Sequence, residues 1–309
     1  MPAAREVAEA TPDHPRLRWA VRNLGQPLLL ATGLLLWWRM GYSEVAALAS
    51  IALVLVLMEV LERVVPARPA WRLGVVARLK LLGLYLAILV VTGVVLAAYE
   101  AVLVPALSTV PGWMGGDPWP ARWPLLLQVV VLFFAADFIY YWIHRAIHRF
   151  GWFWRLSGHG VHHAFHNLHA LNVGSTHPFE VLFLTLPLVV LGAVFGAPGE
   201  AIAGATVLLV TNGTLAHANL DMDTPGLRWL VTTANQHRRH HSQVFEQSNS
   251  NYACNAIAWD RLFGTYSEGP VEQTGIGPTQ PGYWQMLWMP LREPADADTA
   301  ASRARAQRL

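Results

Sequence analysis

Charged side chains are scarce in this 309-residue sequence. They make up 14% of the residues, while 54% of the residues are hydrophobic, and the mean hydropathy is positive. A typical soluble domain carries about 25% charged residues. The shortage of charge argues against an ordinary soluble fold and indicates a chain whose main solvent is a lipid bilayer.

Cysteine is also nearly absent, because Cys254 is the single one. One cysteine excludes an internal disulfide framework and the cysteine-rich zinc and iron–sulfur sites. Any metal must therefore be bound by histidine, aspartate or glutamate. A cleavable signal peptide is not expected either, since no small-residue cleavage site follows the first apolar run. With a net charge of +2 and no basic stripe interleaved with aromatic residues, nucleic-acid binding has little support.

Six apolar runs predict an all-α, integral membrane helical bundle. A membrane span needs roughly 20 residues, so the third and fourth runs are long enough alone, while the first, fifth and sixth are short. The fifth and sixth could form a re-entrant pair, which gives about four to six spans. The runs are residues 24–38, 45–61, 81–104, 123–143, 181–195 and 201–215.

The basic residues predict the orientation of these spans. Five of them lie between the second and third runs, namely Arg63, Arg68, Arg72, Arg78 and Lys80. Short loops rich in Lys and Arg face the cytoplasm. We therefore expect both termini and the segment 144–180 on the cytoplasmic side of a cell inner membrane, with the turn cluster 111–120 outside.

This topology predicts one integral domain with a polar cap. The domain covers residues 24–291, after a cytoplasmic N-terminal segment, 1–23. Residues beyond 220 are mostly polar and should form a cytoplasmic helical cap. Residues 292–309 are rich in Ala, Asp and Arg without an apolar face, so we expect a disordered tail.

Histidine carries the strongest functional signal, because twelve of the thirteen histidines lie between His144 and His241. Three clusters have helical spacing, so each could bring its imidazoles towards a common point. The clusters are His144-Arg-Ala-Ile-His148, His159-Gly-Val-His162-His163 and His237-Arg-Arg-His240-His241. Eight or more clustered imidazoles suggest two metal ions, and the zinc-protease pattern H-E-x-x-H is absent. Imidazole suits Zn, Cu, Fe and Ni alike, so the ligands alone do not name the metal.

A stripe of polar residues leads into the first cluster. Asp137, Tyr141, His144 and His148 are spaced 4, 3 and 4 residues apart and share one face of a helix. An ionisable residue inside a span usually faces the interior of a bundle. Asp137 is therefore a candidate acceptor that orients a ligand imidazole. The alternative is a plain hydrogen bond between helices.

The order of these motifs resembles the fatty acid hydroxylase and sterol desaturase superfamily. The resemblance covers residues 137–266 and includes Asn251-Tyr252 and Trp259-Asp-Arg-Leu-Phe-Gly-Thr-Tyr266. It implies a membrane enzyme with two iron ions that uses O2 to hydroxylate or desaturate a lipid, with electrons from an external donor protein. The absence of Rossmann, flavin and haem motifs agrees with such a donor.

The resemblance also implies the metal ligands, with one histidine supplied by the end of the span before the last box. The expected ligands are His144, His148, His159, His162, His163, His217, His237, His240 and His241. His166, His177 and Asn251 are expected near the metal site, where His177 is either a further ligand or a residue that orients the ligands. The stretch 164–176 departs from the family pattern, so the substrate stays open among fatty acyl, sterol, retinoid, carotenoid and alkyl glycerol lipids.

Two other functions compete with this interpretation. A divalent-metal transporter would place polar ligands near the middle of the membrane in broken helices, whereas the boxes here follow the spans. A zinc-dependent lipid hydrolase would need a carboxylate free to act as general base close to the ligands. The candidates for that role are Glu180, Asp221, Asp223 and Glu246.

Overall fold

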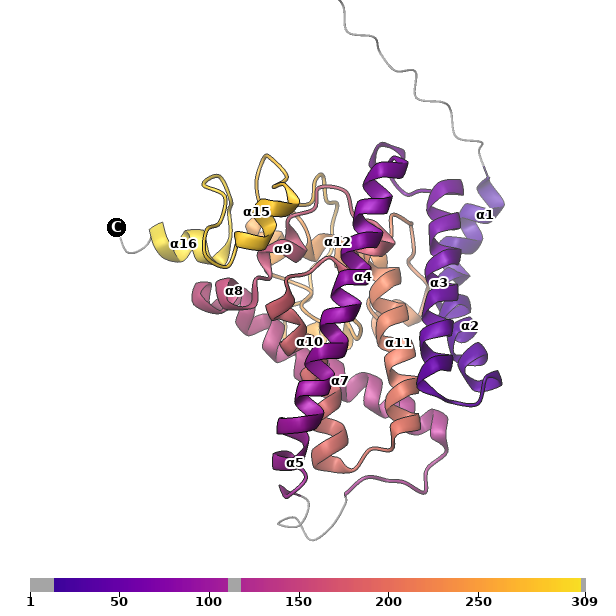
Figure 1. Cartoon of the computed structure of the whole chain (residues 1–309). Helices are drawn as coiled ribbons and strands as arrows, with labels where there is room; N and C mark the ends of the chain where they lie inside the picture. The colour runs from indigo at the N-terminus through magenta and orange to yellow at the C-terminus, as the bar shows by residue number, and fades with distance from the viewer. Residues whose placement is uncertain (1–13, 111–117, 307–309) are drawn as a thin grey trace, which may run out of the picture.

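Six long helices form the body of the structure, a computed structural model that describes residues 14–110 and 118–306. They lie side by side, and shorter helices gather around one end (Figure 1). The six are α2 (Gln26–Arg39), α3 (Glu44–Val64), α4 (Val75–Ala98), α7 (Leu125–Arg149), α10 (Pro178–Phe195) and α11 (Gly199–His217). The predicted all-α bundle is confirmed, since the described residues contain helices and no strand.

Four helices are long and apolar enough to cross a membrane. They are Glu44–Val64, Val75–Leu107, Leu125–Arg149 and Pro178–Phe195. The second of them joins α4 through a π-helical turn, Tyr99–Leu103, to α5 (Val104–Leu107). Large apolar side chains face outward on these helices; Val90 on α4, for example, is 69% exposed. A lipid bilayer accounts for such exposure, which water would not.

The fifth and sixth apolar runs form helices that are longer than the runs themselves. α10 has 18 residues and α11 has 19, and residues 196–198 join them. α10 begins with His177 as N-cap and Pro178 in its first turn, and it ends at Gly196, whose positive φ of 72° suits glycine. The apolar runs end earlier because polar residues, such as Glu180 and His217, occupy the helix ends.

α11 is the central helix of the bundle and packs against α2, α3 and α7. Small residues allow this close packing, as is typical of helix contacts in membranes. At Gly204 an added Cβ would lie 2.6 Å from Trp37 and 2.6 Å from Val129. Polar side chains of α11 also find partners in the interior: Asn212 accepts a hydrogen bond of 2.8 Å from Gln26.

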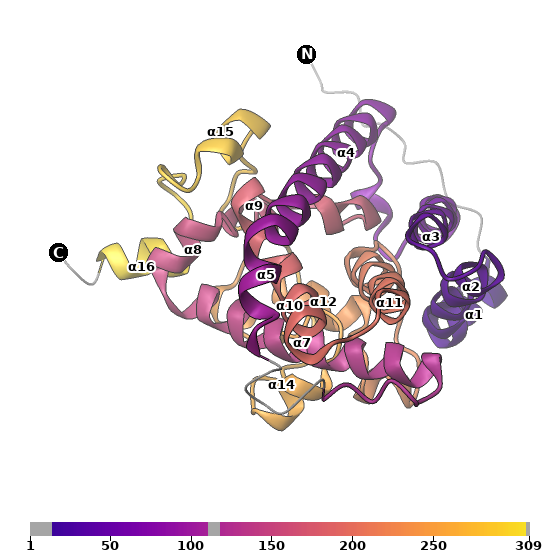
Figure 2. The ribbon, with the colours of Figure 1, turned by 60° about the horizontal axis from the view of Figure 1, so that its bottom comes forward.

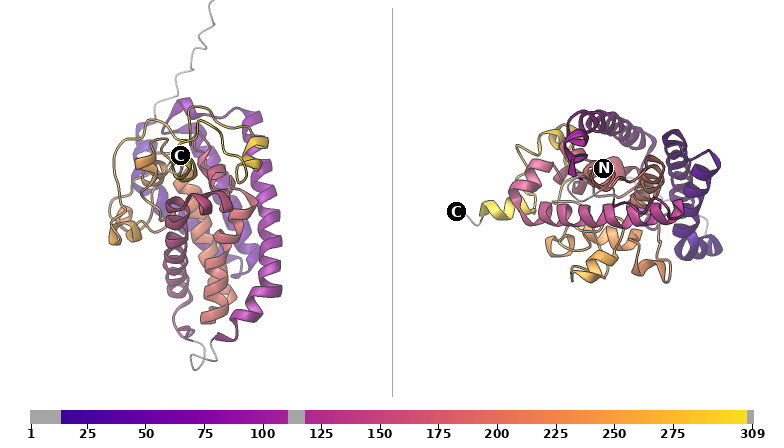
Figure 3. Two further views of the ribbon diagram at one scale, coloured as in Figure 1. Left: turned by 90° about the vertical axis from the view of Figure 1, so that its left-hand side faces the viewer. Right: turned by 90° about the horizontal axis from the view of Figure 1, so that it is seen from below.

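The shorter helices form a cap at the end where α3 and α11 finish and α4 and α10 begin. The segment that contains α14 lies on the face of α7 opposite α4 (Figures 2 and 3). This arrangement encloses the clusters of histidines predicted above. The cap helices are α8 (Gly151–Ser157), α9 (Gly160–His163), α12 (Ala234–His240), α13 (Phe245–Ser248), α14 (Ala258–Leu262), α15 (Tyr283–Trp288) and α16 (Ala300–Ala306).

The predicted disorder of residues 292–309 is wrong for the described part, 292–306. α16 packs on α8, and Ala300 and Ala301 are buried. Gly151 makes this contact possible, because a Cβ there would lie 2.8 Å from the carbonyl oxygen of Ala300. The small side chains of Ala300 and Ala301 are enough for this packing, although the sequence of this stretch shows no apolar face. Residues 1–13 of the N-terminal segment and 111–117 of the turn cluster lie outside the described residues. The described chain begins with α1 (Pro15–Ala20), which continues through a π-helical turn, Val21–Gly25, into α2.

We expect Gly204→Ala to destabilise the bundle by about 1–3 kcal/mol, because the added methyl group overpacks the contact with Trp37 and Val129. The midpoint of thermal unfolding in detergent measures the effect. Gly93→Ala on α4 is the matched control, since an added Cβ there meets no atom within 4 Å. Equal midpoints for the two variants would contradict the packing role of Gly204.

Candidate metal centre

Nine buried histidines form two groups, each of which can hold a metal ion. Five of them make up the first group: His144, His148, His159, His163 and His240. The second group contains the other four: His162, His217, His237 and His241. These nine are the residues predicted as ligands, and each is at most 8% exposed.

The two H-x-x-H-H boxes divide their histidines between the groups. His159 and His163 belong to the five-histidine group, whereas His162 between them belongs to the four-histidine group. The third box is divided in the opposite sense, with His240 separated from its neighbours. The expectation of convergence on one point is therefore wrong for these two boxes, because consecutive side chains of a helix point about 100° apart, whereas His144 and His148 of the first cluster do share one group.

The two groups lie next to each other. The rings of His163 and His241 are stacked with centroids 4.4 Å apart, and those of His237 and His240 are stacked at 5.4 Å. Two metal ions held by these groups would be close neighbours. Such pairs of ions are the arrangement that oxygen and hydrolytic chemistry at two metals requires.

Local structure places each set of histidines. His144 and His148 lie in the last turns of α7, and His217 is the last residue of α11. α9 follows Gly158, whose φ of 72° and lack of a Cβ allow the chain to pass against His177. α12 begins with a capping box in which Thr233 is the N-cap. Each box is thus held by a helix end.

Backbone carbonyls fix the orientation of several rings. The Nδ1 atoms of four histidines lie within hydrogen-bond distance of carbonyl oxygens: His144 at 2.6 Å from Tyr252, His240 at 2.8 Å from Ser250, His217 at 2.7 Å from Gly213 and His162 at 3.3 Å from Ser175. A carbonyl can only accept, so Nδ1 carries the proton and Nε2 carries the lone pair. These lone pairs face the centres of the groups.

The distances between the Nε2 atoms fit metal ions. Neighbouring Nε2 atoms lie 2.9–3.1 Å apart in the five-histidine group and 3.1 Å apart in the four-histidine group. Metal–nitrogen bonds of about 2.1 Å at right angles would place neighbouring nitrogens roughly 3.0 Å apart. Facing lone pairs at this distance repel each other unless a cation lies between them.

The imidazoles are poised to bind metal because they are neutral. Burial lowers the pKa of His159 and of His162 to about 3. Burial and the neighbouring imidazoles also hold the pKa of His163 and His241 well below the usual range. Metal ligation needs the unprotonated ring, so no proton has to be removed at neutral pH.

Glu180 is a supporting residue whose role the sequence did not reveal. Its Oε1 lies 2.5 Å from Nδ1 of His159, and it also accepts hydrogen bonds from Thr176 and Tyr140. The carboxylate therefore does for His159 what the carbonyls do for other rings. The only signal was its position in His177-Pro-Phe-Glu180, which places it in the first turn of α10.

All four carboxylates considered as hydrolytic bases already have partners. Glu180 holds His159, as described above. The others form ion pairs with arginines: Asp221 with Arg22, Asp223 with Arg22 and Arg228, and Glu246 with Arg303. A general base needs a free oxygen within reach of the water that it activates. The described residues therefore favour a pure histidine centre over a zinc hydrolase site.

Asp137 acts on the loop between α13 and α14 and only through it on a histidine. It accepts hydrogen bonds from the backbone N–H groups of Asn255 (3.0 Å) and Ala256 (2.8 Å). This loop also contains Tyr252, whose carbonyl oxygen binds His144. Asp137 therefore does not accept a hydrogen bond from a ligand imidazole, contrary to the expectation from the sequence. Its hydrogen bonds to the backbone of Asn255 and Ala256 are closer to the alternative, a plain hydrogen bond between parts of the fold.

Tyr141 and Asn251 hold the same loop. The hydroxyl of Tyr141 lies 2.9 Å from Oγ1 of Thr265. Asn251 has a positive φ of 53°, and its side chain donates to the carbonyls of Gln236 and Ser267. Both residues thus position the chain around the histidines, and their contacts with the loop explain why they accompany the boxes.

Among the described residues, His166 and His177 lie outside both groups. His166 has its Nε2 3.0 Å from the carbonyl oxygen of Gly277. His177 caps α10 by accepting from the N–H of Phe179, and its Nε2 donates to the carbonyl of Leu287. His177 therefore joins α10 to the α15 segment, and the structure gives it no position as a ligand.

A third cluster joins α3 to the stretch after the second box. His169 has its Nε2 2.7 Å from Glu62 and its Nδ1 3.3 Å from Glu59. Glu62 also accepts from the N–H of Asn219, two residues after His217. The departure from the family pattern at 164–176 thus contains a buried contact between His169 and Glu62, and Glu62 helps to position the end of α11.

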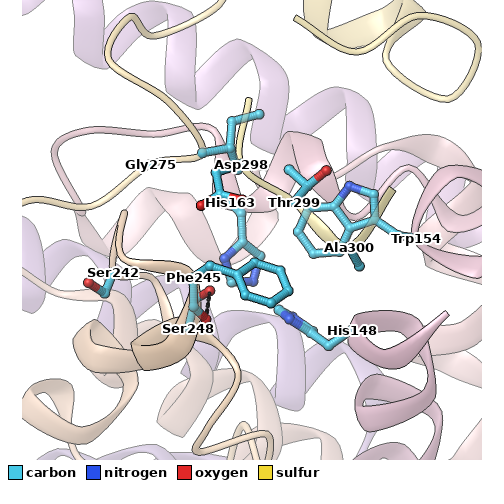
Figure 4. A pocket seen from close by; sticks show the side chains of 11 residues that line it. His148, Trp154, His163, Ser242, Phe245, Ser248, Gly275, Asp298, Thr299 and Ala300 are labelled. Carbon is cyan, nitrogen blue, oxygen red and sulfur yellow. Dashed lines mark hydrogen bonds between the residues drawn. The ribbon is translucent and has the colours of Figure 1, made fainter. Parts of the chain in front are cut away.

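A small pocket lies against the five-histidine group. Figure 4 shows His148 and His163 facing it, with Trp154 and Thr299 beside them. Its volume is about 10 Å³, roughly enough for one water-sized molecule. The C-terminal stretch closes this pocket, because Glu293 accepts hydrogen bonds from Trp154 and Thr299.

Comparisons with known proteins agree with the geometry. The family model described as fatty acid hydroxylase matches residues 129–265. Ornithine lipid hydroxylase OlsE from Rhizobium tropici is 32% identical over 289 residues, which cover 85% of this chain and 81% of that protein. Alkylglycerol monooxygenase from Danio rerio is 31% identical over 48% of this chain and 32% of that protein. Methylsterol monooxygenase 2-2 from Arabidopsis thaliana is 28% identical over 50% of this chain and 58% of that protein. No solved structure matches the chain.

We expect His240→Ala in the five-histidine group and His162→Ala in the four-histidine group to lose most of the bound metal and the activity while the protein still inserts into the membrane. Each change removes one imidazole nitrogen from the group of ligands that would bind a metal ion. Elemental analysis of detergent-purified protein measures the loss. His166→Ala is the control and should keep its metal, since this ring contacts Gly277. Full metal content in both ligand variants would disprove the assignment.

Glu180→Gln should weaken metal binding by about 10- to 100-fold. The amide can still accept from His159, but the charge that makes this ring a stronger ligand is lost. Competition with a chelator measures the affinity. Glu246→Gln, which removes a carboxylate from the exposed pair with Arg303, should bind metal as the wild type does. Equal metal affinities for Glu180→Gln and the wild type would show that the charge of Glu180 does not strengthen metal binding.

Proposed function

The chain belongs to the fatty acid hydroxylase family, and from this premise we propose that it hydroxylates a C–H bond of a membrane lipid with O2 at a pair of iron ions. The observation that carries the proposal is the pair of adjacent groups of five and four neutral imidazoles. Imidazole suits iron as well as other transition ions. His144 and His148 lie at the end of the candidate span α7, which supports a centre at the edge of the lipid phase.

The proposed reaction balances with an external electron donor. A lipid C–H bond, O2, two electrons and two protons give a C–OH group and water. Bound iron would supply the activation of O2, with the nine histidines as its ligands. The described chain contributes no other redox group, and its sequence has no flavin, haem or dinucleotide motif. We therefore expect a separate donor protein.

The residues of the chain hold and shield this centre. The carbonyls of Tyr252 and Ser250 keep the protons of His144 and His240 on Nδ1, and Glu180 does the same for His159. Burial of all nine rings excludes bulk water from the centre. Exclusion of water protects reactive oxygen species from side reactions. The C-terminal stretch contributes by closing the pocket beside His148 and His163.

The relatives guide the choice of lipid. A relative that the chain matches over most of both lengths is named an ornithine lipid hydroxylase, and the alkylglycerol and methylsterol relatives are named monooxygenases. We therefore favour hydroxylation over desaturation and an amino-acid-containing membrane lipid as the first substrate to test. The relatives also include proteins named very-long-chain aldehyde decarbonylases, so the family alone does not fix the reaction.

The competing functions have less support. A metal transporter would need a polar route to its ligands in mid-membrane, whereas these ligands are buried at one end of the helices. A zinc hydrolase would need a free carboxylate, and the candidates considered are paired. We also propose that the histidine end faces the cytoplasm of a cell inner membrane, because the basic loop between α3 and α4 lies at this end.

Metal analysis and product analysis together test the proposal. We expect about two coupled irons per chain by elemental analysis and Mössbauer spectroscopy of protein expressed with labelled iron. The loaded protein, given a reductant, a donor and isotopically labelled O2, should add one labelled oxygen atom to ornithine lipid. Alkylglycerol and sterol lipids are tested in parallel. A lipid that loses two hydrogens without gaining oxygen would identify a desaturase instead.

The outcome that overturns the proposal is one zinc ion and no iron after expression with ample iron. That result would favour a zinc-dependent lipid hydrolase or a divalent-metal transporter. His240→Ala is the matched control for the product assay, since it removes one ligand from the five-histidine group. Labelled product from this variant equal to that of the wild type would show that the oxidation does not occur at this centre.

A further inference from the structure

The α15 segment has one buried and one exposed apolar face. Met286 and Met289 are each 2% exposed and face the cap. Met289 packs against Gly160 at the start of α9, where an added Cβ would lie 2.7 Å from its Cε. This face therefore fixes α15 to the second histidine box.

The opposite face is an apolar stripe of four residues. Trp284, Leu287, Trp288 and Leu291 are 70%, 46%, 47% and 69% exposed. Their spacing of i, i+3, i+4 and i+7 places them on one side of a helix, and the helical turn continues past α15 because the N–H of Leu291 donates to the carbonyl of Trp288. Arg292 is exposed directly after the stripe.

The stripe continues the exposed apolar surface of the candidate span α10. His177, the N-cap of α10, donates to the carbonyl of Leu287. Two residues later Phe179 begins the outward face of this candidate span and is 51% exposed. Arg155 of α8 holds the other end of the stripe through the carbonyls of Pro290 and Leu291. The apolar surface of α10 and that of α15 are therefore neighbours.

We propose that the face formed by Trp284, Leu287, Trp288 and Leu291 lies in the membrane interface and anchors the cap to the lipid headgroup layer. Tryptophan prefers this layer because its ring is apolar and its N–H is polar. Arginines beside an in-plane apolar helix bind lipid phosphates, and Arg292 and Arg155 have the right positions. The occupant of this face is thus the phospholipid bilayer.

This anchor sets the depth of the metal centre relative to the lipid. α15 is fixed to α9 through Met289 and to the start of α10 through His177. The headgroup layer is thereby placed beside the second histidine box. The inference concerns membrane contact alone and holds for any chemistry at the histidines.

Spin-label accessibility in nanodiscs of phosphatidylcholine and phosphatidylglycerol tests the proposal with the full chain. A nitroxide attached to Trp288→Cys or Leu291→Cys should collide several-fold more often with O2, relative to a water-soluble nickel chelate, than one attached to Glu272→Cys on the exposed cap. Val90→Cys on α4 is the lipid-facing reference. The wild-type chain, with Cys254 only, gives the labelling background.

Two outcomes would overturn the proposal. Collision ratios at both stripe positions equal to that of Glu272→Cys would place the stripe in water. Protection from both quenchers would show that a protein surface, either a second copy or another partner, covers it. Both stripe residues are exposed, so their substitution leaves the packing of Met286 and Met289 intact. The result does not depend on whether the protein oxidises a lipid.

Discussion

The repulsion between facing nitrogen lone pairs is the constraint on which this structure depends. Neutral imidazoles with protons held on Nδ1 bring their Nε2 atoms to about 3 Å from one another. A cation between the facing nitrogens would relieve this repulsion, and the surrounding chain has to hold the rings in place. Carbonyl acceptors, the Glu180 carboxylate and helix ends provide this support from several parts of the chain.

The bundle and the cap depend on each other. α11 brings His217 to the centre only because small residues such as Gly204 let it lie in the middle of the bundle. Asp137, deep in α7, holds the loop whose carbonyl orients His144. Positions within the long helices thus determine the geometry of ligands at their ends, which gives the site the rigidity of a protein core.

The sequence predicted the features that local spacing encodes. The apolar runs predicted the long helices, and the histidine clusters predicted the nine residues that meet. Spacing could not predict the division of each box between two groups, because that depends on the directions from which α7 and α11 approach. Glu180 and the C-terminal stretch were misjudged for a related reason. Their roles arise from contacts with residues distant in sequence, such as His159 and Gly151.

The division of the boxes ties the two centres together covalently. His162 and His163 are consecutive residues that serve different groups, and so are His240 and His241. Their Cα atoms are about 3.8 Å apart across one peptide unit, so the separation of the two centres is set by the backbone of two short helices. Unwinding of α9 or α12 would remove ligands from both centres at once. An ion bound by one group would thereby also help to position the adjacent ligand of the other group.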